Sequence, residues 1–165
     1  MGDLSNERAY NDWGFSDVKK EIFEQYRLNK NDIVVTRTAT LGLNKLISDN
    51  LNAVYNNGII RLRIDESKIF PIIVYNQLQS QDFKNYISKI TGETSVRPNM
   101  KINYLLDYFI PVLGKEKQKQ MYDILYPIFL LKEKLTCNNI ILAKIRDTLL
   151  PKLLNGEIDI SKINI

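Results

Sequence analysis

A seven-residue repeat of apolar side chains between Lys115 and Leu150 constrains this chain more than any other feature of its sequence. Apolar residues recur at every seventh position, and a second apolar series lies three residues after the first, which is the a/d pattern of a coiled-coil seam. Such a pattern predicts a long helix whose narrow apolar stripe is covered by another helix lying along it. The predicted seam consists of Met121, Ile124, Ile128, Leu131, Leu135, Asn138, Leu142, Ile145 and Leu149.

The helix that covers this seam is expected to come from another molecule, because the chain has no second helical pattern of that length. The partner is either a second copy of this chain or a different protein, and two copies packed antiparallel would bury both seams. Asn138 occupies a d position near the middle of the seam, where a polar side chain lowers stability but can fix the register. Pro127 is expected to kink or divide the helix, and Pro151 with Gly156 to end it.

Composition excludes most hydrolase mechanisms. The chain has no histidine and one cysteine, Cys137, which removes the common zinc sites and Ser/His or Cys/His nucleophilic catalysis. It has no glycine-rich phosphate loop, and its five prolines are never adjacent, so it lacks the Asx-Pro-Pro-aromatic loop of amino-methyltransferases. We therefore expect no catalytic residue, no metal site and no cofactor.

Charge and hydropathy indicate a cytoplasmic protein with no membrane contact. The 23 Lys and Arg against 19 Asp and Glu give a net charge of +4, a bias that permits nucleic-acid binding without arguing strongly for it. No apolar run approaches the ~20 residues that a membrane helix needs, and the polar start does not resemble a secretory signal. A single cysteine suits a reducing compartment.

The first 113 residues mix short helical and strand patterns, which predicts an α+β domain followed by the long helix. Ser16 is a plausible N-cap for a helix that reaches Tyr26. The expected strands are 33–38, 43–48, 53–55, 59–64 and 108–113, and the expected helices are 69–78, 83–90 and 102–106.

Two stretches carry residues suited to DNA. Threonine hydroxyls and arginine after the first strand can bind phosphate oxygens, and arginine can also read guanine; the alternative is a solvated strand end. The loop 91–99 is rich in hydrogen-bonding groups, with lysines before and after it, although it can equally be a plain connection. Arg61 and Arg63 are better explained as the charged face of an exposed strand. The candidate DNA contacts are Thr36, Arg37, Thr38, Thr40, Lys84, Lys89, Ser95, Arg97, Asn99 and Lys101.

The segment Lys144–Ile160, with the sequence KIRDTLLPKLLNGEIDI, closely resembles the segment that closes a repeat in the specificity subunits of type I restriction-modification enzymes. Other pieces recur in the same order in that family, and the resemblance covers roughly residues 25 to 160. These pieces are Thr36–Gly42, the helix pair at 69–90, Thr91–Gly92, Arg97–Asn99, and Ile110–Pro111 ahead of Glu116–Gln118.

The resemblance implies three parts: a target-recognition domain at 1–113, a spacer and dimerisation helix at 114–152, and a short tail at 153–165. It implies a non-catalytic subunit that reads one half-site of double-stranded DNA and docks methyltransferase (modification) subunits, and through them the restriction subunit. Whole subunits of this family carry two repeats whose helices pack antiparallel, whereas this chain has one. It is therefore expected to pair through the long helix with a second copy or another half-subunit.

A second interpretation differs in class. The resemblance does not reach the opening part of a recognition domain, which favours an interaction module that dimerises and binds modification subunits without reading DNA. The retained stretches Thr36–Gly42 and Arg97–Asn99 favour DNA recognition instead.

Overall fold

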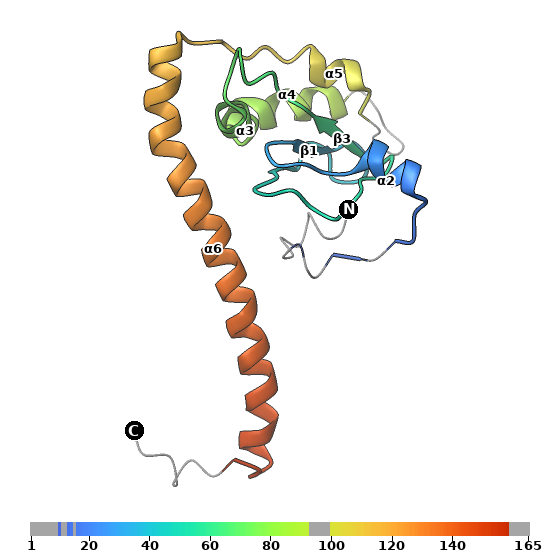
Figure 1. Cartoon of the computed structure of the whole chain (residues 1–165), viewed down its shortest axis with the longest axis vertical. Coiled ribbons are helices and arrows are strands. Elements are labelled where there is room, and N and C mark those ends of the chain that lie inside the picture. The colour runs from blue at the N-terminus through green and yellow to red at the C-terminus, as the bar shows by residue number, and fades with distance from the viewer. Residues whose placement is uncertain (1–9, 11–12, 15, 93–99, 159–165) are drawn as a thin grey trace. The chain divides into compact units, whose positions relative to one another are not determined.

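The computed structural model describes residues 10, 13–14, 16–92 and 100–158 (Figure 1). It has a small α+β part, as predicted, followed by one long helix. By its internal contacts the chain divides into two compact units, 1–130 and 131–165, so the long helix begins in the first unit and ends in the second. The elements in chain order are α2 (Lys20–Tyr26), β1 (Ile33–Thr36), β2 (Asn44–Leu46), β3 (Ile59–Leu62), α3 (Pro71–Leu78), α4 (Gln81–Gly92), α5 (Ile102–Leu106) and α6 (Lys115–Leu154).

Strand β1 is the centre of a three-stranded antiparallel sheet with the order β2-β1-β3. Ile33 pairs with Leu46 on one side and with Leu62 on the other. All four residues of β1 are buried, because this strand has neighbours on both edges and side chains packed on both faces. A run of β-branched residues suits this position, where no side chain reaches water.

The two faces of β1 meet different cores. Ile33 and Val35 join the main core, which α3 and α4 cover with Ile72, Leu78 and Phe83. The residue between them, Val34, points to the opposite face and packs in a smaller cluster. The other members of that cluster are Leu28 and Ile47, with Tyr10, Trp13, Leu51, Tyr55 and Ile59 against them.

The first turns of α6 pack on the same main core. Gln118 is buried, and its Nε2 donates to the carbonyl oxygens of Lys68 at 3.0 Å and Leu113 at 2.6 Å. One turn later the centre of the Tyr122 ring lies 4.8 Å from the centre of the Phe70 ring. The ring centres of Phe129 and Tyr75 lie 5.8 Å apart. Phe129 is 5% exposed, so this part of α6 belongs to the core of the first unit.

Several expected boundaries are wrong. Helix α2 begins at Lys20 rather than after Ser16, and its N-cap residue, Lys19, makes no side-chain capping bond. Residues 53–55 form no strand, because only Val54 pairs, in an isolated bridge with Arg27. Short local patterns favoured these elements, but backbone pairing with a neighbour decides whether they form.

The expected strand at 108–113 is also absent. Its first residue, Tyr108, is held through its side chain instead: the hydroxyl donates to Asp82 at 2.8 Å and accepts from Gln77 Nε2 at 3.0 Å. Burial raises the pKa of this hydroxyl. The rest of this segment has no regular secondary structure up to the start of α6.

Neither proline divides α6. The helix runs through Pro127, whose missing N–H removes one backbone hydrogen bond while Tyr126 and Phe129 beside it stay packed. It also runs through Pro151 and ends at Leu154, and Gly156 follows with a φ of +73°. That left-handed residue ends the helix, because its geometry turns the chain away and suits glycine.

Adjacent residues on α6 should respond oppositely to truncation. Phe129→Ala removes a buried ring and should lower the free energy of unfolding by about 3–5 kcal/mol, whereas Ile128→Ala alters an exposed side chain and should change it by less than about 0.5 kcal/mol. Urea unfolding of both, in a Leu135→Glu background that keeps chains apart, provides the comparison. Equal losses would mean that α6 does not pack on the domain through Phe129.

Candidate helix-pairing seam and nucleic-acid interface

The predicted seam residues lie along one face of α6, and all but one of them are exposed. Ile124 is 63% exposed and Leu142 is 60% exposed, which is unusual for large aliphatic side chains. Met121 is the exception, because it is half-buried against the main core. An exposed apolar row of this length is typical of interaction surfaces.

Between Gln118 and Leu135, helix α6 therefore carries two rows of mostly apolar side chains. Gln118, Tyr122, Leu125 and Phe129 follow a 4-3-4 spacing and face the core. Ile124, Ile128, Leu131 and Leu135 follow the same spacing and face outward. At about 100° per residue the two faces lie roughly 120° apart around the helix, so the core cannot cover the seam.

The loop after β1 holds the first group of DNA candidates. The Thr36 side chain is 1% exposed, and its hydroxyl donates to the carbonyl oxygens of Thr40 and, at 3.3 Å, Leu43. This hydroxyl shapes the loop, and a DNA contact by Thr36 stays a prediction that would require the loop to open. Arg37 and Thr38 are half-buried and Thr40 is exposed.

This loop packs tightly on α4. Gly42 has a φ of +78°, and a Cβ there would come within 3.0 Å of the Ile87 side chain. Glycine is required at this position by both its backbone conformation and the close approach of α4. The contact joins the loop to the helix that carries the candidates Lys84 and Lys89, which are both exposed. Since five residues correspond to about 140° around a helix, one flat DNA surface would not meet both lysines.

The structure also brings Lys101 to the loop. The backbone N–H of Met100 donates to the carbonyl of Arg37 at 2.8 Å, which places Lys101 beside this segment. Lys101 is exposed at the start of α5. Arg37, Thr40 and Lys101 thus come from two distant stretches and lie in one region. The candidates Ser95, Arg97 and Asn99 lie outside the described residues.

One ion pair was missed by the sequence reasoning. Arg63 donates from Nε to Asp32 Oδ1 at 2.8 Å and from Nη2 to Oδ2 at 2.9 Å, and the backbone N–H of Asn29 donates to the same carboxylate. Asp32 is buried, and its hydrogen bond raises the pKa of the Arg63 guanidinium. Arg63 therefore has a structural partner, which its interpretation as part of the charged face of an exposed strand did not include.

Arg61 is engaged within the domain as well. Its Nη1 donates to the carbonyl of Arg27 at 2.8 Å, and its guanidinium lies 5.0 Å from the centre of the Tyr55 ring. The alternating pattern of β3 showed only that its basic residues share a face. Their hydrogen-bond partners, Arg27 for Arg61 and Asp32 for Arg63, lie 34 and 31 positions away in the sequence, where no local signal could have found them.

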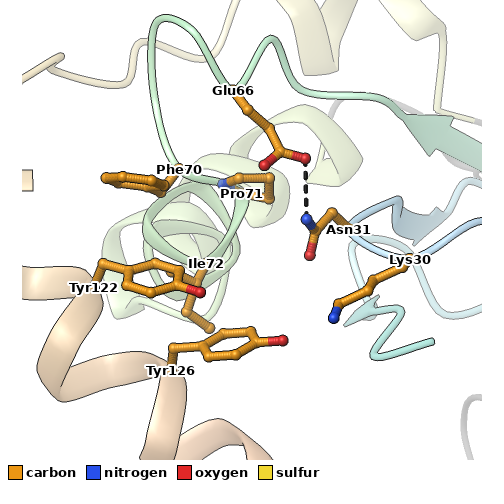
Figure 2. Close-up of a pocket in the computed structure, with 8 residues that line it drawn as sticks. All are labelled: Lys30, Asn31, Glu66, Phe70, Pro71, Ile72, Tyr122 and Tyr126. Atoms are coloured by element: carbon orange, nitrogen blue, oxygen red, sulfur yellow. Dashed lines mark hydrogen bonds between the residues drawn. The ribbon is translucent and has the colours of Figure 1, made fainter. Parts of the chain in front are cut away.

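A small pocket lies where α6 meets the domain (Figure 2). Its volume is about 150 Å³. The rings of Tyr122 and Tyr126 stack with centres 5.0 Å apart, and Asn31 donates to Glu66 across the pocket at 3.0 Å. The lining residues are Lys30, Asn31, Glu66, Phe70, Pro71, Ile72, Tyr122 and Tyr126. Its aromatic walls belong to the contact that holds α6 on α3.

No protein-family model and no curated protein matches this chain. Within the part of the chain that the structure describes, none of the helices combines the length and the apolar character needed to cross a membrane.

The two arginines of β3 should differ in their effect on stability. Arg63→Ala leaves the buried Asp32 carboxylate without its bidentate partner and should lower the free energy of unfolding by about 1–3 kcal/mol. Arg61→Ala removes the side chain's hydrogen bonds to the Arg27 and Gln25 carbonyls and a ring contact near the surface, and should cost below about 1 kcal/mol. Urea unfolding at pH 7 checks this, and a smaller loss for Arg63→Ala would show that the ion pair contributes little.

Proposed function

We propose that this chain is a non-catalytic DNA-specificity subunit of a type I restriction-modification enzyme, which pairs through α6 and docks methyltransferase subunits. The observation that carries the proposal is the exposed heptad seam on a helix whose other face is already packed on an α+β domain. The resemblance of Lys144–Ile160 to the end of a repeat in that family supports it.

The seam supports pairing because the core of the domain forms without the exposed seam residues. The core of the first unit includes Phe129 and the aromatic side chains beside it on α6, and this contact leaves Ile124 and Ile128 outside. Leaving large aliphatic side chains in water costs about 25 cal/mol for each Å² of apolar surface, which a partner helix would recover. An exposed row of this kind is retained in an interaction protein rather than in a self-contained domain.

The proposed DNA-facing region is the loop after β1 together with the start of α5. Arg37, Thr40 and Lys101 gather there, and Lys84 on α4 is exposed close to the residues that pack under Gly42. Positive charge and hydroxyl groups suit phosphate oxygens, and Arg37 suits a base edge as well. In this role the chain positions the complex on its DNA site, and the methyltransferase and restriction subunits carry out the chemical reactions.

The second candidate is an interaction module that pairs and docks the modification subunits without reading DNA. The burial of Thr36 favours this second candidate. Thr36 begins the loop proposed to face DNA, and its hydroxyl already makes hydrogen bonds inside the domain. Both candidate functions use the seam for pairing, so DNA binding is the property that distinguishes them.

Pairing can be tested with one added charge. Wild-type protein should have twice the 19.2 kDa chain mass by light scattering at micromolar concentration, and Leu135→Glu should be monomeric because it puts a carboxylate in the seam. Cys137→Glu is the matched control: Cys137 is exposed on the opposite side of the same turn, so this variant should remain dimeric. A monomeric wild type would contradict the proposed pairing.

DNA reading can be tested by selection from randomised duplexes, with a type I modification subunit present. We expect one enriched half-site, and Arg37→Ala should reduce the slope of log affinity against log salt by about one unit if the guanidinium contacts a phosphate. Arg61→Ala serves as the control and should leave the slope unchanged, since Arg61 is engaged within the domain. Enrichment of no motif would favour the interaction module.

A further inference from the structure

The loop 37–43 between β1 and β2 contains a backbone conformation that its side chain does not favour. Ala39 has a φ of +61°, in the left-handed region where alanine is uncommon because its Cβ comes close to the following carbonyl oxygen. Gly42 in the same loop is also left-handed, but glycine adopts that conformation readily and α4 packs against it. Ala39 is exposed, so packing does not account for its conformation. A strained residue in an exposed loop points to a role for the backbone of that loop.

Three successive N–H groups of this loop make no hydrogen bond. Within the described part of the chain, the backbone N–H groups of Ala39, Thr40 and Leu41 donate to no other group. The next N–H, that of Gly42, is engaged, because it donates to the Thr36 carbonyl at 2.9 Å and closes the loop. Successive N–H groups in a turn conformation form a concave site that suits an anion.

The buried Thr36 side chain sets the direction of one of these N–H groups. Its hydroxyl donates to the Thr40 carbonyl oxygen, which therefore points toward the interior of the domain. The Thr40 carbonyl and the Leu41 N–H belong to one planar trans peptide group, in which they point in opposite directions. The Leu41 N–H consequently points away from the buried hydroxyl. Thr36 is thus a positioning residue for the backbone of the loop.

The surroundings of the loop favour an anion. The stretch 33–48 contains no Asp or Glu, and Arg37 lies in the loop itself. Lys101 lies beside it, because the Met100 N–H donates to the Arg37 carbonyl at 2.8 Å. The Thr40 side chain is exposed and adds a hydroxyl that can donate to an oxygen. Neutral donors beside two cations suit a phosphate, whose several oxygens are strong acceptors.

The exposure of the site favours a phosphate that is carried by DNA. Ala39 and Thr40 are exposed, so the site gives a free ion little enclosure. A duplex presents its phosphates on its surface, where a loop can reach them, and cations beside the loop can meet neighbouring phosphates of the same strand. Backbone N–H groups are among the donors that contact phosphates in protein–DNA complexes, and they position the protein without reading the sequence.

We propose that the backbone N–H groups of Ala39, Thr40 and Leu41 bind one phosphate of double-stranded DNA, and that the buried Thr36 hydroxyl positions them. This inference rests on the proposed function, because the phosphate belongs to the DNA that the chain is proposed to read. Thr36 supports binding from inside the domain without contacting DNA. The main chain anchors the loop, which leaves Arg37 for contacts with other phosphates or with a base edge.

The amide resonances of the loop test the site directly. When a duplex is added to the isotope-labelled wild-type chain, the amide protons of Ala39, Thr40 and Leu41 should shift downfield, because each then donates to a charged oxygen. A duplex of arbitrary sequence suffices, since a phosphate contact carries no sequence information. Inorganic phosphate is the comparison and should shift the same three amides more weakly, because it lacks the neighbouring phosphates of a strand.

A matched pair of substitutions tests the role of Thr36. Thr36→Val keeps the β-branched shape but removes the hydroxyl, and should weaken duplex binding roughly tenfold, which corresponds to about one hydrogen bond to a charged group. Thr36→Ser retains the hydroxyl and should bind like the wild type. The slope of log affinity against log salt should stay unchanged in Thr36→Val, because neutral N–H groups release no counterions. This result differs from the one expected for Arg37→Ala.

The remaining outcomes contradict separate statements. Duplex binding that leaves the three amides unshifted would overturn the proposed site, and so would a folded Thr36→Val variant that binds like the wild type. Shifts with inorganic phosphate but not with the duplex would overturn DNA as the source of the phosphate. If Thr36→Val does not fold, the amide shifts of the wild type decide alone. A wild type that binds no duplex even with a type I modification subunit present would contradict the proposed function itself.

Discussion

The packing of the first turns of α6 on the α+β domain is the contact on which the rest of the structure depends. Phe129, Tyr122 and the buried Gln118 commit one face of the helix to the main core. Because these residues and the heptad row lie roughly 120° apart on the same turns, committing one face leaves the other in water. The exposed apolar row of this chain is thus a consequence of how its domain is completed.

The domain is organised around a buried strand and a few polar contacts that hold its loops. β1 has neighbours on both edges and cores on both faces, so the segments at its two ends are fixed. At one end Asp32 receives the bidentate bond of Arg63, and at the other the Thr36 hydroxyl and Gly42 shape the loop that packs on α4. Charged residues that the sequence could not tell apart therefore fall into two groups. Some bind partners within the domain, and others are exposed and remain candidates for DNA contacts.

Local patterns predicted the helices better than the strands. The α+β class, the pair of helices around Ser80 and the long helix follow from periodicity and from turn residues, which act within a few positions. The strands at 53–55 and 108–113 were wrong because a strand needs a backbone partner from elsewhere in the chain. For the candidate site, the seam residues were found by spacing, whereas the proximity of Arg37 to Lys101 depends on a backbone contact across more than 60 residues.

By itself the sequence determined that α6 carries a heptad row with a polar residue near its centre, because that property depends only on spacing along one helix. Only the tertiary structure decided which face of α6 packs on the domain, that Met121 packs partly on the core, and that Arg63 forms an ion pair with Asp32. Those outcomes depend on contacts between residues far apart in the sequence, and such contacts form only when the whole domain has folded.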